Sequence, residues 1–142
     1  MTPIHGLRAF AAGAAGALVL FVGAGVVNGA VLGAEWNAWV KALGGLNHAP
    51  SNGVGMILWL VVSLVLGMAG AWLHAAIRPR YGTRRRGALV AATWLWATGF
   101  LAPAIGQLAL GAIPANIVVV DCAGGAVSAA LAMLAAAAVY RQ

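Results

Sequence analysis

Residues 78–86 read RPRYGTRRR and carry five of the eight basic residues in the chain. They lie between two long apolar stretches of a sequence that is otherwise almost free of charge. Because arginine and lysine concentrate in the cytoplasmic loops of membrane proteins, this segment is predicted to orient the whole chain in a bilayer. It is also predicted to contact anionic lipid headgroups. Its basic residues are Arg78, Arg80, Arg84, Arg85 and Arg86.

The composition excludes an ordinary soluble domain. The 142 residues are 63% hydrophobic and only 7% charged, whereas a soluble domain carries about 25% charged residues. A chain of this size could not hide so much apolar surface from water, so one membrane domain is predicted to fill residues 1–142. The net charge of +6 lies at the ends of apolar segments, which favours lipid contacts and no nucleic-acid partner.

Four segments are long and apolar enough to cross a bilayer, which takes about 20 residues. None shows strand alternation, and only helices or closed barrels satisfy their backbone in lipid. We therefore predict an all-α membrane protein whose four transmembrane helices form an antiparallel bundle. The first span exceeds the apolar run of a signal peptide, so we expect it to be retained. The predicted spans are residues 9–33, 53–77, 87–111 and 114–140.

The distribution of basic residues predicts the direction of crossing. With both termini in the cytoplasm, Arg8, the 78–86 segment and Arg141 lie inside, and only Lys41 lies outside. The reverse arrangement would export all the others, which the positive-inside rule opposes. The predicted location is the bacterial inner membrane, with both termini cytoplasmic.

The loops between the predicted spans differ in kind. In the long first outer loop, Trp36, Trp39 and Val40 recur at helical spacing. This pattern predicts a short amphipathic helix lying in the outer interface, with its tryptophans at headgroup depth. In the second loop, Pro79 and Gly82 are predicted to break the helix.

Small residues are predicted to bring the helices together, because lipid tails are as apolar as leucine and exert no hydrophobic pressure on them. The last span has a small residue at every fourth position, including Gly124, Ser128 and Ala132. We expect this face to pack inside the bundle, with a subunit interface as the alternative. Gly25 and Gly29 offer a similar face on the first span.

Asp121 is the one acidic residue within a predicted span. A bare carboxylate at membrane depth is costly, so it must be protonated, paired or close to water. Three other polar residues are predicted to reach a similar depth and to form a cluster with it, capped by His48 from the first outer loop. The cluster is either a proton- or cation-linked site or a hydrogen-bonded plug that fixes helix register. Its other members are Asn28, Gln107, Asn116 and His48.

Three further residues in the spans receive weaker interpretations. His74 has no second histidine within a span, so internal haem ligation by two histidines is disfavoured and a headgroup-level histidine is expected. Cys122 cannot form an intramolecular disulfide and is expected to be inert. Pro103 is predicted to kink the third span near Gly99. We expect no metal site and no cofactor.

The sequence resembles an uncharacterised family of small four-helix bacterial integral membrane proteins. The resemblance extends over nearly the whole chain and implies the four-helix fold, but no activity comes with it. It rests on Trp36 and Trp39, Gly87 followed by Trp94 and Trp96, the Ile113-Pro114 turn, the Gly124-Gly125 pair, and Val139-Tyr140 before a basic residue.

These features favour a non-catalytic protein. The leading prediction is an accessory or structural subunit that packs with itself or with a larger membrane complex. The alternative is a small proton- or cation-coupled transporter or channel centred on Asp121. A third, weaker interpretation is a subunit that contributes a pigment or haem ligand through His74.

Overall fold

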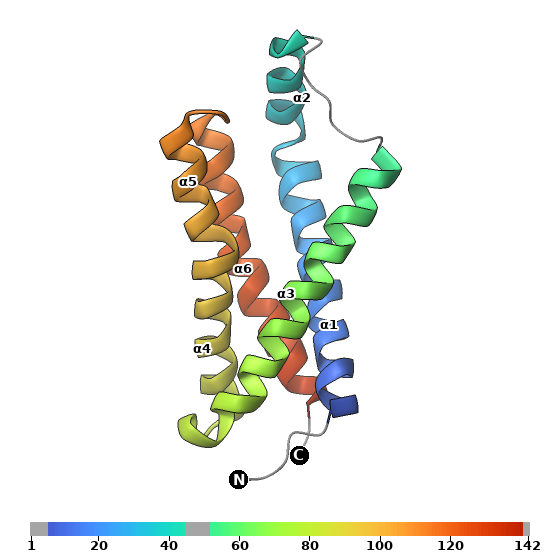
Figure 1. The fold of residues 1–142 in the computed structure, drawn as a ribbon, viewed down its shortest axis with the longest axis vertical. Coiled ribbons are helices and arrows are strands. Elements are labelled where there is room, and N and C mark those ends of the chain that lie inside the picture. The colour runs from blue at the N-terminus through green and yellow to red at the C-terminus, as the bar shows by residue number, and fades with distance from the viewer. Residues whose placement is uncertain (1–5, 45–51, 141–142) are drawn as a thin grey trace.

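A computed structural model describes residues 6–44 and 52–140, and the regular structure within these ranges is entirely helical (Figure 1). Four helices are long and apolar enough to cross a membrane. The predicted all-α class and the four spans are therefore confirmed. Their observed bounds are Gly6–Val31, Gly53–Tyr81, Arg84–Leu110 and Ala115–Val139.

Two of the four spans contain a short π-helical segment. The first span consists of α1 (Gly6–Gly25) and the π-helix η1 (Val26–Val31), and α2 (Gly33–Ala42) follows it. The second span is α3 (Asn52–Tyr81). The third consists of α4 (Arg84–Trp96), the π-helix η3 (Ala97–Leu101) and α5 (Ala102–Leu110), and the fourth is α6 (Ala115–Val139).

The two ends of the molecule differ in width (Figure 1). The start of α1, the turn between α3 and α4 and the end of α6 lie at one end, here called the arginine end. The turn between α5 and α6 lies at the other end, with α2 extending beyond it, and we call this the α2 end. Helix α3 is inclined: it packs beside α4 near the arginine end and lies apart from α5 at the α2 end.

The arginine-rich hairpin is formed by a helix end, a glycine and a helix cap. Helix α3 continues through Pro79 to Tyr81, so the predicted break at Pro79 is wrong and the helix ends two residues later. Pro79 removes one i→i−4 hydrogen bond from the last turn, and only two helical residues follow it. Gly82 then adopts a φ of +69°, and the Thr83 hydroxyl accepts a 3.3 Å hydrogen bond from the Arg86 amide.

Helices α1 and α3 approach each other closely at Gly67. A Cβ atom at this position would lie 2.6 Å from the Ala17 nitrogen and 2.6 Å from the Gly13 oxygen. Both are backbone atoms, so they cannot move aside as a flexible side chain could. The two helices therefore cross where glycine allows their backbones to touch.

The small-residue face of α6 packs inside the bundle against the first span. Gly124 lies against Val27, Ser128 against Gly23, and Ala132 is completely buried beside Gly16. The predicted packing role of Gly25 and Gly29 is wrong within this chain. A Cβ atom at either glycine would meet no atom within 4 Å, because these residues are on the face of the first span that points away from α6.

The half of the bundle near the arginine end is closed by small side chains. All four spans contribute to one core cluster, in which Leu95 and Met133 fill the space between many buried alanines. Small side chains allow the helices to approach each other closely. The cluster includes Ala9, Ala12, Ala71, Ala75, Ala88, Ala91, Ala132 and Ala136.

Both π-helical segments lie in the other half of the molecule, where the helices separate. In η1 the Leu32 amide donates to the Val27 oxygen over 2.9 Å, which is the wider i→i−5 pattern. In η3 the Ala102 amide donates to Ala97 in the same way. This segment contains Gly99, so the irregularity expected from Pro103 occurs as a widened turn.

Helix α2 continues roughly along the direction of α1 and extends beyond the rest of the bundle (Figure 1). The predicted position of this helix in the outer interface is not confirmed by this arrangement. A hydrogen bond of 2.9 Å from the Trp36 indole to the Asn28 side chain holds the first turn of α2 onto η1. Trp36 and Trp39 pack edge to face, with ring centroids 5.5 Å apart.

The contact at Gly67 gives a direct test of the packing. We expect Gly67→Ala to lower the free energy of unfolding by about 1–3 kcal/mol, because the added methyl group overlaps backbone atoms of α1. Gly55→Ala on the same helix is the control, since its Cβ atom would meet nothing within 4 Å. Thermal unfolding in detergent measures both. Equal stability of the two variants would contradict the backbone contact.

Candidate binding cavity

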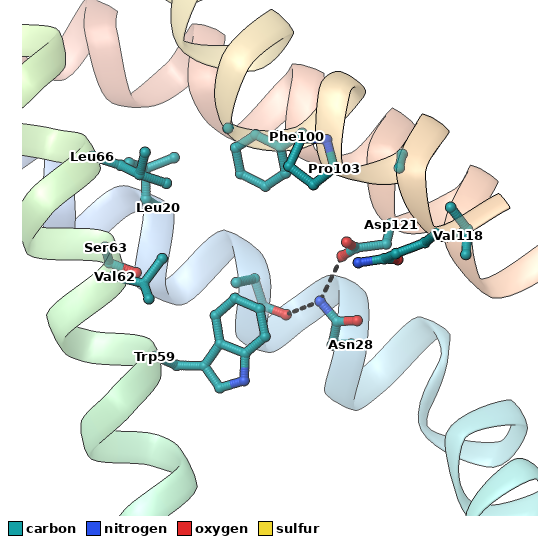
Figure 2. A pocket seen from close by; sticks show the side chains of 14 residues that line it. Leu20, Asn28, Trp59, Val62, Ser63, Leu66, Phe100, Pro103, Val118 and Asp121 are labelled. Atoms are coloured by element: carbon teal, nitrogen blue, oxygen red, sulfur yellow. Dashed lines mark hydrogen bonds between the residues drawn. The ribbon is translucent and has the colours of Figure 1, made fainter. Parts of the chain in front are cut away.

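A cavity of about 260 Å³ lies between the separated helices in the half of the bundle near the α2 end (Figure 2). Leu20 and Asn28 line it from the first span, Trp59 and Ser63 from α3, and Phe100, Pro103 and Gln107 from the third span. Val118 and Asp121 complete it from α6. A mostly apolar cavity with a few convergent polar groups is typical of a small-molecule site.

The two π-helical segments form opposite walls of this cavity. Asn28 comes from η1, while Gly99 and Phe100 come from η3. A π-turn inserts an extra residue and so redirects the side chains that follow it, and such turns are frequent at functional sites. Here they direct an amide from one wall and an aromatic ring from the other into the same space (Figure 2).

A chain of hydrogen bonds joins Asp121 to two other elements. The Asn28 amide nitrogen donates to the Asp121 Oδ1 atom over 2.7 Å and to the Ala24 carbonyl over 3.3 Å. The Asn28 Oδ1 atom accepts from the Trp36 indole over 2.9 Å. Asn28 is therefore held from both sides, and its amide is fixed in the orientation that presents a donor to the carboxylate.

The charge of Asp121 has no opposite charge beside it. The residue is half-buried and lies six positions after the start of α6, or about 9 Å along the helix. Within the described residues no basic side chain pairs with it, and the Asn28 amide is the one donor that reaches it. An anionic carboxylate at this depth needs a proton, a cation or water to compensate its charge.

The structure brings some of the predicted polar residues together and leaves others apart. Asn28 and Asp121 are hydrogen-bonded, and Gln107 lines the same cavity. Asn116 is exposed and lines none of this cavity, so its predicted membership is wrong. Five residues along a helix correspond to about 140° of rotation, which places Asn116 away from Asp121. His48 lies outside the described residues.

Three residues that contribute to the site were not predicted from the sequence. Trp36 was assigned to headgroup depth, yet its indole orients Asn28. Ser63 is only 4% exposed and adds a hydroxyl to the cavity wall, and Phe100 adds an aromatic ring. The eight-residue separation of Asn28 and Trp36, about two helical turns, was the one available signal for the first of these.

His74 lies near the arginine end and is enclosed by protein, so its depth relative to the headgroups stays a prediction. It is 1% exposed. Its ring packs edge-on against Tyr140, with centroids 6.5 Å apart, and its Nδ1 atom would lie 3.4 Å from a Cβ atom at Gly87. Ligation of a pigment or haem would require the imidazole to turn away from both neighbours.

Metal-binding groups are sparse in the part of the chain that the structure describes. No group of three or more histidine, cysteine, aspartate or glutamate side chains is placed to hold a metal ion there. Cys122 is half-buried, and its backbone carbonyl accepts a 2.9 Å hydrogen bond from the Trp96 indole. This bond ties α6 to the third span one residue after Asp121.

Comparison with known proteins returns no match to a family model, to a curated protein or to a solved structure. The resemblance to small four-helix membrane proteins therefore stays a prediction. The features that bear on function are the cavity and the Asp121 carboxylate at its edge.

The hydrogen bond between Asn28 and Asp121 can be measured by a double-mutant cycle. For Asn28→Ala and Asp121→Ala we expect a coupling energy of at least about 1 kcal/mol in the free energy of unfolding, because a hydrogen bond to a carboxylate is charge-assisted. The control cycle pairs Asn28→Ala with Asn116→Ala, and its effects should be additive. Coupling to Asn116 as strong as coupling to Asp121 would contradict the observed cluster.

Proposed function

We propose that this protein is a small proton- or cation-coupled transporter or channel, with Asp121 as the coupling group. The observation that carries the proposal is a membrane-depth carboxylate that has no basic partner within the described residues and is oriented by Asn28 at the edge of a cavity. Ionisable residues within membrane spans commonly mark ion pathways and proton relays. Protonation or cation binding would neutralise the Asp121 carboxylate at the edge of the cavity.

The proposed orientation follows from the positive-inside rule. The arginine end faces the cytoplasm, both termini lie on that side, and the four spans cross the bacterial inner membrane as an antiparallel bundle. The arginines 78–86 then contact the headgroups of the inner leaflet. In this orientation the cavity opens toward the outer side, and α2 lies at the outer interface.

The closed half of the bundle supports one-sided access to Asp121. The alanine-rich core near the arginine end is fully buried and is contributed by all four spans. A ligand or proton at Asp121 would therefore be closed off from the inner side in this conformation. Transport would require α1, α3 and α6 to repack around the Gly67 contact so that the inner half opens.

A second candidate function is that of a non-catalytic accessory subunit that associates with itself or with another membrane protein. One observation favours it: in the α2-end half of α3, most large side chains are exposed, including Met56, Trp59 and Val61. Lipid covers such a surface, but so would a partner helix. Stable co-purification in mild detergent would support this role, and migration as a monomer would weigh against it.

The proposed transport function is tested by removing one negative charge. We expect Asp121→Asn to abolish proton- or cation-driven flux in proteoliposomes, because the amide keeps the shape and can still accept the Asn28 hydrogen bond but cannot ionise. Flux is followed with a pH-sensitive dye enclosed in the vesicles. The variant should retain the thermal stability of the wild type within about 1 kcal/mol.

The matched control is Glu35→Gln, which removes the only other acidic side chain of the chain. Glu35 is exposed in the first turn of α2 and lines none of the described cavity. Its loss should leave flux unchanged. Equal flux through wild type and Asp121→Asn would reject the proposal.

A further inference from the structure

An apolar groove of about 460 Å³ lies between the first span and α3 and shares lining residues with the cavity. Phe21, Val22 and Met56 form its apolar walls. The groove and the cavity share Ala24, Asn28 and Trp59, so these three residues lie between the apolar groove and the Asp121 region. Figure 2 shows Trp59 beside Asn28, which is hydrogen-bonded to Asp121.

Two glycines keep this groove open. Gly25 and Gly29 line it, and a Cβ atom at either position would meet no atom within 4 Å. They are therefore not packed against another helix of this chain. A larger side chain at either position would project into the groove without disturbing the backbone contact at Gly67.

The chemistry of the path changes from apolar to anionic along its length. It begins at aliphatic and thioether side chains, passes the Trp59 ring, and ends at the Asp121 carboxylate, which no basic side chain neutralises in the described part of the chain. An apolar wall selects a lipophilic body, aromatic rings attract a cation over their faces, and the carboxylate supplies the opposite charge. A neutral or anionic molecule would lack this last interaction.

From this geometry we propose that the ligand of the Asp121 cavity is a small aromatic organic cation that enters sideways from the bilayer, through the groove kept open by Gly25 and Gly29. The proposal rests on the proposed function of Asp121 and adds the class of ligand and its route. The cationic group lies beside Asp121 and Asn28, and the aromatic body lies against Trp59 and Phe100.

The ligand class is tested with a fluorescent pair of probes on the full chain in lipid nanodiscs. The cation dimethylaminostyryl-N-methylpyridinium should bind, while its unmethylated parent, studied at a pH where it is neutral, should bind at least about tenfold more weakly. Asp121→Asn should weaken binding of the cation by a similar factor. Glu35→Gln should have no effect. Equal binding of the two probes would overturn the proposed class.

The route is tested by stopped-flow fluorescence with the same cation. Gly25→Leu and Gly29→Leu should each slow association and dissociation by about tenfold and leave Kd within about twofold, because the added side chain narrows the path and not the site. Gly106→Leu is the control. Gly106 is exposed on α5, has open space around it, and lines neither the groove nor the cavity. Rates in both groove variants that match those of Gly106→Leu would overturn lateral entry.

These experiments distinguish failure of the proposed route or ligand class from failure of the proposed transport function. Cation binding that depends on Asp121, with unchanged rates in the groove variants, overturns the route alone. Absence of cation binding, with flux that still requires Asp121, overturns the ligand class and leaves the transport function standing. Flux that is independent of Asp121 overturns the proposed function itself, whatever the probes show.

Discussion

The backbone contact at Gly67 is the constraint on which the architecture depends. Lipid supplies no hydrophobic pressure between helices, so their association requires surfaces smooth enough for close packing. A Cβ atom at Gly67 would lie only 2.6 Å from backbone atoms of α1. Toward the arginine end, alanines allow all four spans to stay close. Toward the α2 end, Trp59, Leu66 and Phe100 are too large for such an approach, and the space between the helices becomes the cavity.

The same division of the bundle determines which polar groups are satisfied. At the α2 end, Asn28 is bonded on both sides, and the Asp121 carboxylate receives one donor. At the arginine end, neither nitrogen of His74 has a hydrogen-bond partner among the described residues, and the Tyr140 hydroxyl has none either. Buried groups without partners are costly. The two ends therefore differ in chemistry as well as in packing, with an open anionic site at one and closed, unsatisfied polar groups at the other.

Sequence alone was sufficient for the spans because the signal is long and additive. Each apolar run extends over 25 or more residues, and the small-residue face of the last span repeats every fourth position. The position of Asn28 relative to Asp121 was also within reach, since both lie near the same end of their spans. These predictions depend on helical geometry, which is regular.

Some of the predictions that failed depend on departures from that geometry. The π-turns of η1 and η3 redirect side chains by a fraction of a turn, which no spacing rule anticipates, and α2 follows the direction set by η1 and the Trp36 hydrogen bond. Gly25 and Gly29 matched a packing motif but line a groove, where a Cβ atom at either position would meet no atom within 4 Å. The spacing of small residues does not specify which neighbour they meet. The sequence favoured an accessory subunit because the cavity could not be predicted from it. The geometry around Asp121 supports a transporter or channel more strongly.

The central claim is that the cavity opens to the outside of the cell while the arginine end stays inside and closed. Single cysteines at positions 107 and 82, in a chain whose Cys122 is replaced by alanine, test it with a membrane-impermeant thiol reagent added to intact cells. The account predicts that Gln107→Cys is labelled from outside and that Gly82→Cys is labelled only after the cells are opened. Labelling of position 82 in intact cells, with position 107 protected, would contradict it.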